Sequence, residues 1–212
     1  MPARGPAVLA SEWRAMSTLS ITALVDRLNR LGPADITMPR VAELVGDGAL
    51  DEATLRPFIG GRPDKYARRL VHRSKLFDVM VLTWLPGQFT PVHNHAGNLG
   101  WVRLVRGQIS EETFKLVPGA SLPEAATAAK VNGRQGCVGL EATGTGVIAT
   151  CGAVATADRV RAIHRLGNPA KSGGDTTVTL HVYSLPHDTC LSFDLESRTC
   201  ERRDLRFDDP IG

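Results

Sequence analysis

The sequence predicts a mainly β domain, either a sandwich or a barrel, that follows a few short α-helices. From Tyr66 onward, short runs rich in β-branched and aromatic residues alternate with Gly, Pro, Asn and Asp. The first sixty residues instead space their apolar side chains as helices do. A chain of 212 residues with 42% hydrophobic content can build the core of one domain.

Three helices are expected before the β region. In 17–31 the apolar residues Leu24, Val25, Leu28 and Leu31 recur at helical spacing, with Ser17 or Ser20 as the N-cap. Gly32-Pro33 ends this helix. The ranges 39–45 and 50–58 predict the second and third helices, the second with Pro39 early and Gly46 after it. We therefore expect an N-terminal extension, 1–16, and a single domain, 17–212, that is helical over 17–60 and a barrel over 66–207.

Seven short strands are predicted in the β region, and they cover 77–85, 101–106, 108–116, 147–150, 160–164, 176–184 and 190–195. The Ala-rich stretch 118–130 is expected to be an exposed insertion.

Composition excludes several classes of function. The net charge is only +3 and no Lys/Arg run occurs, so we expect no nucleic-acid partner. No apolar run approaches the roughly 20 residues that span a bilayer, and the first residues lack the apolar core of a signal peptide. The four cysteines form neither a CxxC pair nor a disulfide scaffold, and we expect them to be buried. A cytoplasmic monomer is the expectation.

The strongest chemical signal is the pair His93 and His95, which follows the strand-like run 77–84. Side chains two apart on a strand share a face, so both imidazoles can reach one ion. His164, at the end of another strand-like run, is a third candidate ligand. Imidazole suits Zn, Cu, Fe and Ni better than Mg or Ca. The sequence therefore predicts a metal site.

The spacing Gly87-x5-His93-x-His95-x4-Gly100-x6-Gly107 resembles the first motif of the cupins, which are small double-stranded β-helix (jelly-roll) barrels. His164-x3-Asn168 matches the end of the second cupin motif. The acidic ligand of the first motif would fall at position 100, where this chain has Gly100. The resemblance thus implies a site of three neutral imidazoles.

Further segments resemble cysteine dioxygenases, the three-histidine ferrous branch of the cupins. They are Tyr66-Ala-Arg68-Arg-Leu-Val71, Trp84, the run 101–114, and Leu180-His181-Val-Tyr183-Ser-Leu-Pro-His-Asp188-Thr-Cys190-Leu-Ser-Phe193-Asp194. They occur in matching order over roughly 17–207. The chain is therefore identified as resembling a cysteine dioxygenase type I of the bacterial kind, with Fe(II) held by His93, His95 and His164.

The resemblance also implies how substrate is held. An arginine at the place of Arg68 binds the carboxylate of cysteine in that family, and its planar fork suits this task better than Lys. The neighbouring Arg69 would face the other way on an extended chain, so the assignment depends on register. Tyr66 resembles a second tyrosine near the substrate pocket. Relatives that act on 3-mercaptopropionate carry Gln near the place of Arg68.

Thr179, His181 and Tyr183 alternate along one expected strand and so face one side. The family has a Ser-His-Tyr relay there, and Thr179 keeps the hydroxyl. The expected role is to orient the Tyr183 phenol toward the metal-bound substrate. Val178, Leu180 and Val182 should pack on the opposite face.

Two departures from the mammalian pattern stand out. Gly100 replaces the cysteine that cross-links to the active-site tyrosine, so no cross-link can form. Ser184-Leu185-Pro186 replaces Ser-Pro-Pro, which excludes a cis X-Pro bond at residue 185. A cis bond to a non-proline residue costs about 3 kcal/mol, so we expect a differently shaped pocket wall. His72 and His187 have no evident partners and are expected on the surface.

The predicted activity is oxidation of L-cysteine by O2 to cysteine sulfinic acid. A dioxygenase for another small thiol, such as 3-mercaptopropionate, is the nearest alternative. A non-catalytic metal-binding cupin and a Zn, Ni or Mn cupin enzyme such as an isomerase also remain open.

Overall fold

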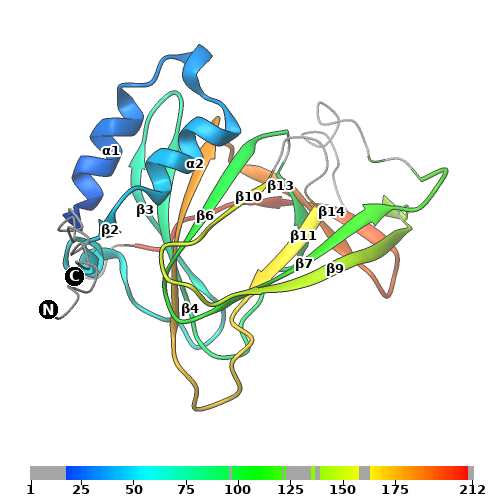
Figure 1. Cartoon of the computed structure of the whole chain (residues 1–212). Coiled ribbons are helices and arrows are strands. Elements are labelled where there is room, and N and C mark those ends of the chain that lie inside the picture. The colour runs from blue at the N-terminus through cyan, green and yellow to red at the C-terminus, as the bar shows by residue number, and fades with distance from the viewer. Residues whose placement is uncertain are drawn as a thin grey trace, which may run out of the picture.

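Two antiparallel sheets form the body of the molecule in the computed structural model, which describes residues 18–95, 97–120, 122, 135–136, 139–157 and 163–209 (Figure 1). The first sheet has the order β10-β6-β12-β4-β3 and the second has the order β8-β14-β13-β5-β11-β7-β9. Their strands interleave along the sequence, so the two sheets together make a double-stranded β-helix of the kind the sequence predicts.

The strands of the first sheet are β3 (Ala67–Arg73), β4 (Asp78–Trp84), β6 (Leu99–Arg106), β10 (Val154–Ala157) and β12 (Thr177–Ser184). Those of the second are β5 (Val92–Asn94), β7 (Ile109–Leu116), β8 (Gln135–Gly136), β9 (Leu140–Ile148), β11 (Ile163–Gly167), β13 (Thr189–Asp194) and β14 (Thr199–Asp204). A separate parallel pair joins β1 (Thr18–Leu19) to β2 (Ala49–Leu50).

Helices α1 (Ile21–Asn29) and α2 (Met38–Gly46) lie against one side of the first sheet (Figure 1). Ser20 caps α1 by accepting from the Ala23 amide, which selects it over Ser17 as the N-cap. Two side chains of β6 fasten α2: Trp101 Nε1 donates to the Met38 carbonyl and Arg103 donates to the Val45 carbonyl. A short 3₁₀ turn, η1 (Pro33–Asp35), joins the two helices.

Several sequence-based expectations differ from the structure. The third predicted helix is the 3₁₀ helix η2 (Glu52–Phe58), which contains Pro57, a residue that disfavours a continuous α-helix. The strand expected at 147–150 overlaps the end of the much longer β9. The rest of β9 was not predicted because its middle is rich in Gly and Thr and lacks an apolar alternation. The strand expected at 160–164 runs to Gly167, and its start lies outside the described residues. Most of the 118–130 insertion also lies outside them.

Central strand β12 separates two apolar clusters. Val178, Leu180 and Val182 point toward the helices and pack with Val79, Val81 and Trp101. The opposite face of the same sheet contributes Met80, Leu82 and Trp84 to the barrel interior. This is the alternation predicted for β12, and it turns Thr179, His181 and Tyr183 inward. In the described part of the chain no helix is both long and apolar enough to cross a membrane.

Candidate metal centre and substrate pocket

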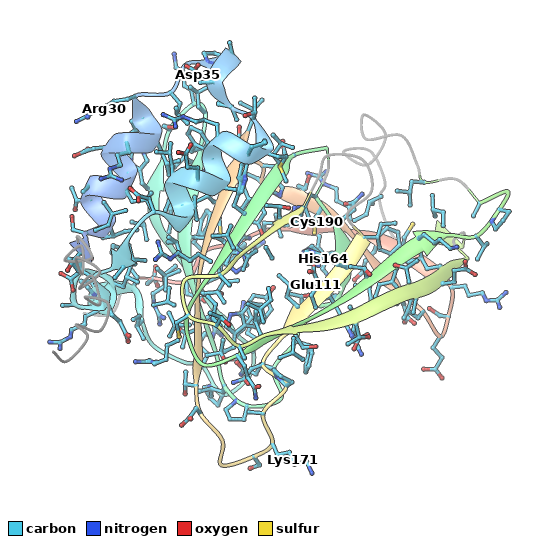
Figure 2. The ribbon with its side chains drawn as sticks, in the orientation of Figure 1. Arg30, Asp35, Glu111, His164, Lys171 and Cys190 are labelled. Atoms are coloured by element: carbon cyan, nitrogen blue, oxygen red, sulfur yellow. The ribbon has the colours of Figure 1, made fainter. Side chains whose placement is uncertain are left out.

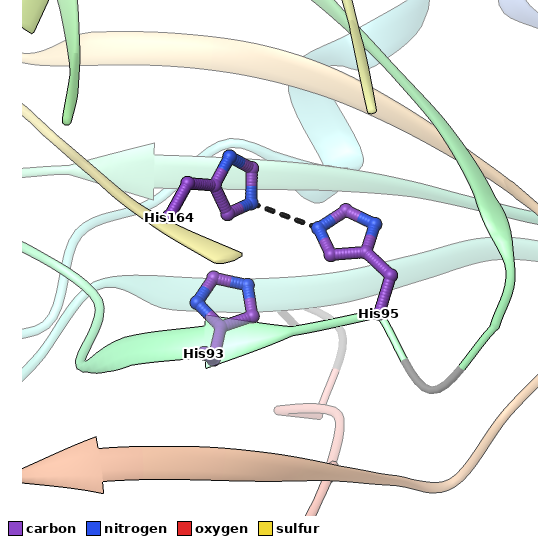
Figure 3. A group of neighbouring side chains, drawn as sticks. All are labelled: His93, His95 and His164. Atoms are coloured by element: carbon purple, nitrogen blue, oxygen red, sulfur yellow. Dashed lines mark hydrogen bonds between the residues drawn. The ribbon is translucent and has the colours of Figure 1, made fainter. Parts of the chain in front are cut away.

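Three histidines meet inside the barrel (Figure 3). His93 lies on β5, His95 follows the end of that strand, and His164 lies on β11, which pairs with β5 so that His164 faces His93. Their ligand atoms all lie within 4.8 Å of one another. The sequence-predicted set of imidazoles is therefore brought together by strand pairing.

The tautomers of two imidazoles follow from their neighbours. His93 Nδ1 lies 3.0 Å from the Pro91 carbonyl, and His164 Nδ1 lies 2.6 Å from Glu111 Oε1. Both partners are acceptors, so each Nδ1 carries the proton and each Nε2 presents a lone pair. His164 Nε2 faces His95 Nε2 at 2.8 Å. This contact is a hydrogen bond in which His95 Nε2 donates to the His164 lone pair, and a metal ion bound by the three imidazoles would replace that proton.

Burial keeps His93 and His95 neutral. Desolvation lowers the pKa of His93 to about 3, and it lowers the pKa of His95 well below its ordinary value, in both cases helped by the neighbouring histidines. Neutral imidazole is the form that binds a metal. His95 Nδ1 is buried without a hydrogen-bond partner among the described residues.

Gly100 lies directly against this centre. A Cβ built there would stand 3.0 Å from His95 Nδ1 and 3.0 Å from Tyr183 Cε1. Both distances are too short for an ordinary contact, so the rings of His95 and Tyr183 occupy the space that a side chain at position 100 would need. The three-imidazole set, without a carboxylate from this position, is therefore consistent with the local packing.

Glu111 is a site residue that the sequence analysis missed, and Figure 2 shows it beside His164. On β7, Glu111 pairs with Leu166 of β11 and so faces the interior, whereas Glu112 faces outward and binds Arg165. A carboxylate that accepts from a ligating histidine fixes the ring and raises its basicity. Only the pairing of β7 with β11, distant in sequence, distinguishes Glu111 from Glu112.

A pocket of about 410 Å³ adjoins the histidines. Its wall includes Tyr66, Arg68, His93, His95, His181 and Tyr183, all predicted from the sequence. His164 and Thr179 lie behind that wall, 2% and 0% exposed. Tyr66 stacks on Trp84 with ring centroids 4.5 Å apart, and burial raises the pKa of its phenol.

Register places Arg68, and not Arg69, at the pocket. Arg68 pairs with Leu82 of β4 and shares its inward face. Arg69 points the other way, where it donates to the carbonyls of Gly60 and Asp209. The sequence left open which of the two arginines faces the pocket, and the strand register shows that it is Arg68.

The residues Thr179, His181 and Tyr183 form a hydrogen-bonded row that begins at Trp84. Trp84 Nε1 donates to Thr179 Oγ1 at 2.8 Å, Thr179 Oγ1 lies 2.9 Å from His181 Nε2, and His181 Nδ1 lies 3.2 Å from Tyr183 Oη. Burial lowers the pKa of His181 to about 3 and raises that of Tyr183 to about 12, so both stay uncharged at neutral pH.

The direction of this row follows from Trp84, which can only donate. If Thr179 then donates to His181 Nε2, His181 Nδ1–H donates to Tyr183, and the phenol proton is left for the pocket. In the reverse arrangement the buried Thr179 hydroxyl proton has no acceptor among the described residues, a loss of about 1–3 kcal/mol. The first arrangement is favoured, and it makes Tyr183 a donor toward the pocket.

His187 corrects the sequence analysis, which expected it on the surface. Its ring lines the pocket and meets the edge of the Tyr183 ring, with centroids 5.2 Å apart. Burial lowers its pKa, assisted by the positive charge of Arg68. The feature that could have identified His187 is its place in the segment 180–194, which resembles cysteine dioxygenases. His72, the other histidine set aside, lies 3.1 Å from the Asn29 amide nitrogen.

The peptide bond before Leu185 and one of the cysteines differ from expectation. The Ser184–Leu185 peptide bond at the pocket end of β12 is cis although residue 185 is not proline, so the cis backbone expected to be lost is present. Cys190 and Cys200 are buried as expected, but Cys151 is exposed, and Cys137 lies outside the described residues. Cys190 lines the pocket, and burial raises its thiol pKa to about 11.

The fold and the site define a cupin-type β-barrel with a buried three-histidine group suited to a metal ion. The family model for cysteine dioxygenase type I matches residues 14–196. The chain belongs to the cysteine dioxygenase type I family.

Curated relatives named cysteine dioxygenase type 1 are distant. The human protein is 23% identical over 149 residues, which cover 70% of this chain and 65% of the human one. The zebrafish protein (Danio rerio) is 26% identical over 61% of this chain and 56% of its own. The chain thus matches less than two thirds of these relatives' length.

Solved structures similar to the chain include two from bacteria. A protein with a double-stranded β-helix domain from Klebsiella pneumoniae is 14% identical with a TM-score of 0.39, covering 62% of this chain and 81% of its own. An RmlC-like cupin from Desulfovibrio desulfuricans is 19% identical with a TM-score of 0.35, covering 59% and 88%.

Replacing Glu111 by Ala should weaken Fe(II) or Zn(II) binding by about 10- to 100-fold, because His164 loses the acceptor that orients it. Competition with a chromophoric chelator measures this. Glu112→Ala is the matched control, since Glu112 is equally exposed at 25% but binds Arg165 on the outer face. Equal metal affinity in the Glu111 and Glu112 variants would contradict the assignment.

The row from Trp84 predicts that His181 carries its proton on Nδ1. Nitrogen-15 NMR of histidine-labelled, Zn(II)-loaded protein reports the tautomer directly, with His181→Gln identifying the signal. Thr179→Val removes the donor to Nε2 and should shift His181 toward a mixture of tautomers. A wild-type His181 protonated on Nε2 would show that the row runs in the opposite direction.

Proposed function

We propose that the protein is an Fe(II)-dependent thiol dioxygenase that oxidises L-cysteine with O2 to cysteine sulfinic acid. The observation that carries this proposal is the meeting of three imidazoles, an inward arginine and a donor phenol at one pocket. The family assignment supports it. Both oxygen atoms enter the product, so the reaction balances as one thiol plus one O2 without a reductant.

His93, His95 and His164 would hold the iron. The Pro91 carbonyl and Glu111 favour the proton on Nδ1 of His93 and His164, which leaves the Nε2 atoms of these two rings for the metal. When bound there, Fe(II) supplies the redox chemistry with O2 and a positive charge that favours the thiolate form of the substrate. Glu111 keeps the His164 ring in place. The ligand set itself is preorganised by the pairing of β5 with β11.

Arg68 is the cation that fits a substrate carboxylate. Its Nε donates to Met80 Sδ at 3.2 Å, and its terminal nitrogens have no partner among the described residues. Free in-plane donors of this kind match the two oxygens of a carboxylate. A substrate with its carboxylate at Arg68 and its sulfur toward the histidines would be held at two points, which would remove rotational freedom before reaction.

Tyr183 would donate a hydrogen bond into the space between the histidines and Arg68. Its phenol is raised to a pKa of about 12 by burial, so it stays protonated across the neutral range. The ring also packs edge-on against His95 with centroids 5.3 Å apart, which keeps the hydroxyl near the metal ligands. Tyr66 and Trp84, whose rings stack on each other, form part of the adjoining pocket wall.

Anaerobic Fe(II) loading followed by oxygen uptake with a panel of thiols tests the function. We expect L-cysteine to give the highest kcat/KM and cysteine sulfinic acid by product mass. Preference for 3-mercaptopropionate would reassign the substrate. Bound iron without any thiol-dependent oxygen uptake would favour a non-catalytic cupin, and activity only with Zn, Ni or Mn would overturn the iron assignment.

Arg68→Gln should lower kcat/KM for cysteine by about 10- to 100-fold, the loss expected for a charge-assisted hydrogen bond, and should affect cysteamine, which lacks a carboxylate, less. Arg106→Gln is the control, since Arg106 pairs with Glu52 on the surface. An equal loss for cysteine and cysteamine in the Arg68 variant would remove the carboxylate role from this residue.

A further inference from the structure

The C-terminal segment 205–209 runs along the open edge of β3, directly at Arg68. β3 is the last strand of its sheet, so its outer backbone groups need partners. The Arg68 amide donates to Asp208 Oδ2 at 2.7 Å, and the Asp208 amide donates to the Arg68 carbonyl at 2.7 Å. One residue thus satisfies both free backbone groups of Arg68.

Phe207 approaches the side chain of the same residue. Its ring lies 4.9 Å from Arg68 Cζ and 5.3 Å from Arg73 Cζ, both within the range of cation–π contact. Phe207 also packs against the interior cluster that holds Met80 and Tyr183. The Arg68 guanidinium is therefore held by the Phe207 ring and by the Met80 sulfur.

These contacts constrain Arg68 without using its carboxylate-binding groups. An aromatic face attracts the flat side of a guanidinium and leaves its in-plane N–H donors available. Asp208 is itself anchored, because Arg62 donates to its carboxylate. Leu205, at the start of the segment, donates to the Asp188 carbonyl at 2.7 Å. The segment is tied at both ends.

We propose that Phe207 and Asp208 are positioning residues that preorganise Arg68 for a ligand carrying a carboxylate. The proposal rests on the proposed function and extends it to residues beyond the 14–196 region that the family model matches. A guanidinium already held in its bound position loses less freedom on binding, so affinity for carboxylate ligands rises selectively.

The test compares two thiols that differ in the carboxylate alone. Anaerobic calorimetric titration of Fe(II)-loaded protein measures Kd for L-cysteine and for cysteamine, which keeps the thiol and the amine. We expect Phe207→Leu and Asp208→Ala each to raise Kd for cysteine about three- to tenfold, the range of cation–π and preorganisation effects, and to leave Kd for cysteamine unchanged. Phe207→Tyr should restore wild-type binding.

Asp64→Ala is the matched control, because Asp64 also binds Arg62 but does not contact Arg68. Unchanged cysteine affinity in both variants, or an equal loss for both thiols, would overturn the proposal. So would a wild-type protein that binds both thiols equally well. If Phe207→Leu does not fold, Asp208→Ala decides the same question.

The failure of the proposed function gives a different result. A wild-type protein that binds cysteine more tightly than cysteamine but shows no oxygen uptake would refute the dioxygenase, while the variants still decide whether 205–209 positions Arg68.

Discussion

The two-residue alternation of β12 is the constraint on which the site depends. One face of this strand supplies Val178, Leu180 and Val182 to the core beneath the helices, and the other supplies the hydrogen-bonded row. Because a shift by one residue would exchange these faces, burying the apolar set fixes the register of the polar set. Packing of the core therefore places Tyr183 toward the metal centre.

Burial inside the barrel sets the protonation states of several site residues. Desolvation keeps His93, His95 and His181 neutral and Tyr183 protonated, so two of the candidate metal ligands and the hydrogen-bond donor have the forms that the proposed function needs at neutral pH. Two charged groups remain beside the neutral ones. Glu111 supports His164 from behind, and Arg68 faces the pocket with its terminal donors free among the described residues. Under the proposed function, their opposite signs suit a cationic metal and an anionic substrate.

The sequence predicted the residues whose spacing lies within one strand or one motif. His93 and His95, His164 with Asn168, and the row on β12 all follow from local patterns. Asn168 is fully buried, where its side chain donates to the Trp84 and Asp175 carbonyls. Glu111 was missed because its role depends on pairing between distant strands. His187 was set aside because it had no evident partner in the sequence, although it lies within the 180–194 segment that resembles the family; its contact with the Tyr183 ring is visible only in the structure.

The edges of the fold were also harder to predict. The sequence of β14 is mostly charged and does not predict a strand. Its strand conformation depends on pairing with β13. Phe207 and Asp208 lie beyond it, and their contacts with Arg68 join residues about 140 positions apart. Propensity and periodicity are local quantities, so they carry no information about such contacts. The cis bond at Ser184–Leu185 opposed the local expectation for a non-proline residue.

The central claim is that three imidazoles hold an iron ion to which a thiol substrate binds directly. X-ray absorption at the iron edge of the anaerobic Fe(II) protein, recorded before and after addition of L-cysteine, measures this most directly. We predict a first shell of nitrogen and oxygen with histidine scattering that gains one sulfur when cysteine is added. A first coordination shell that stays the same when cysteine is added would contradict direct binding of the thiol to iron. Histidine scattering that is undiminished in His93→Ala would contradict the three-histidine site.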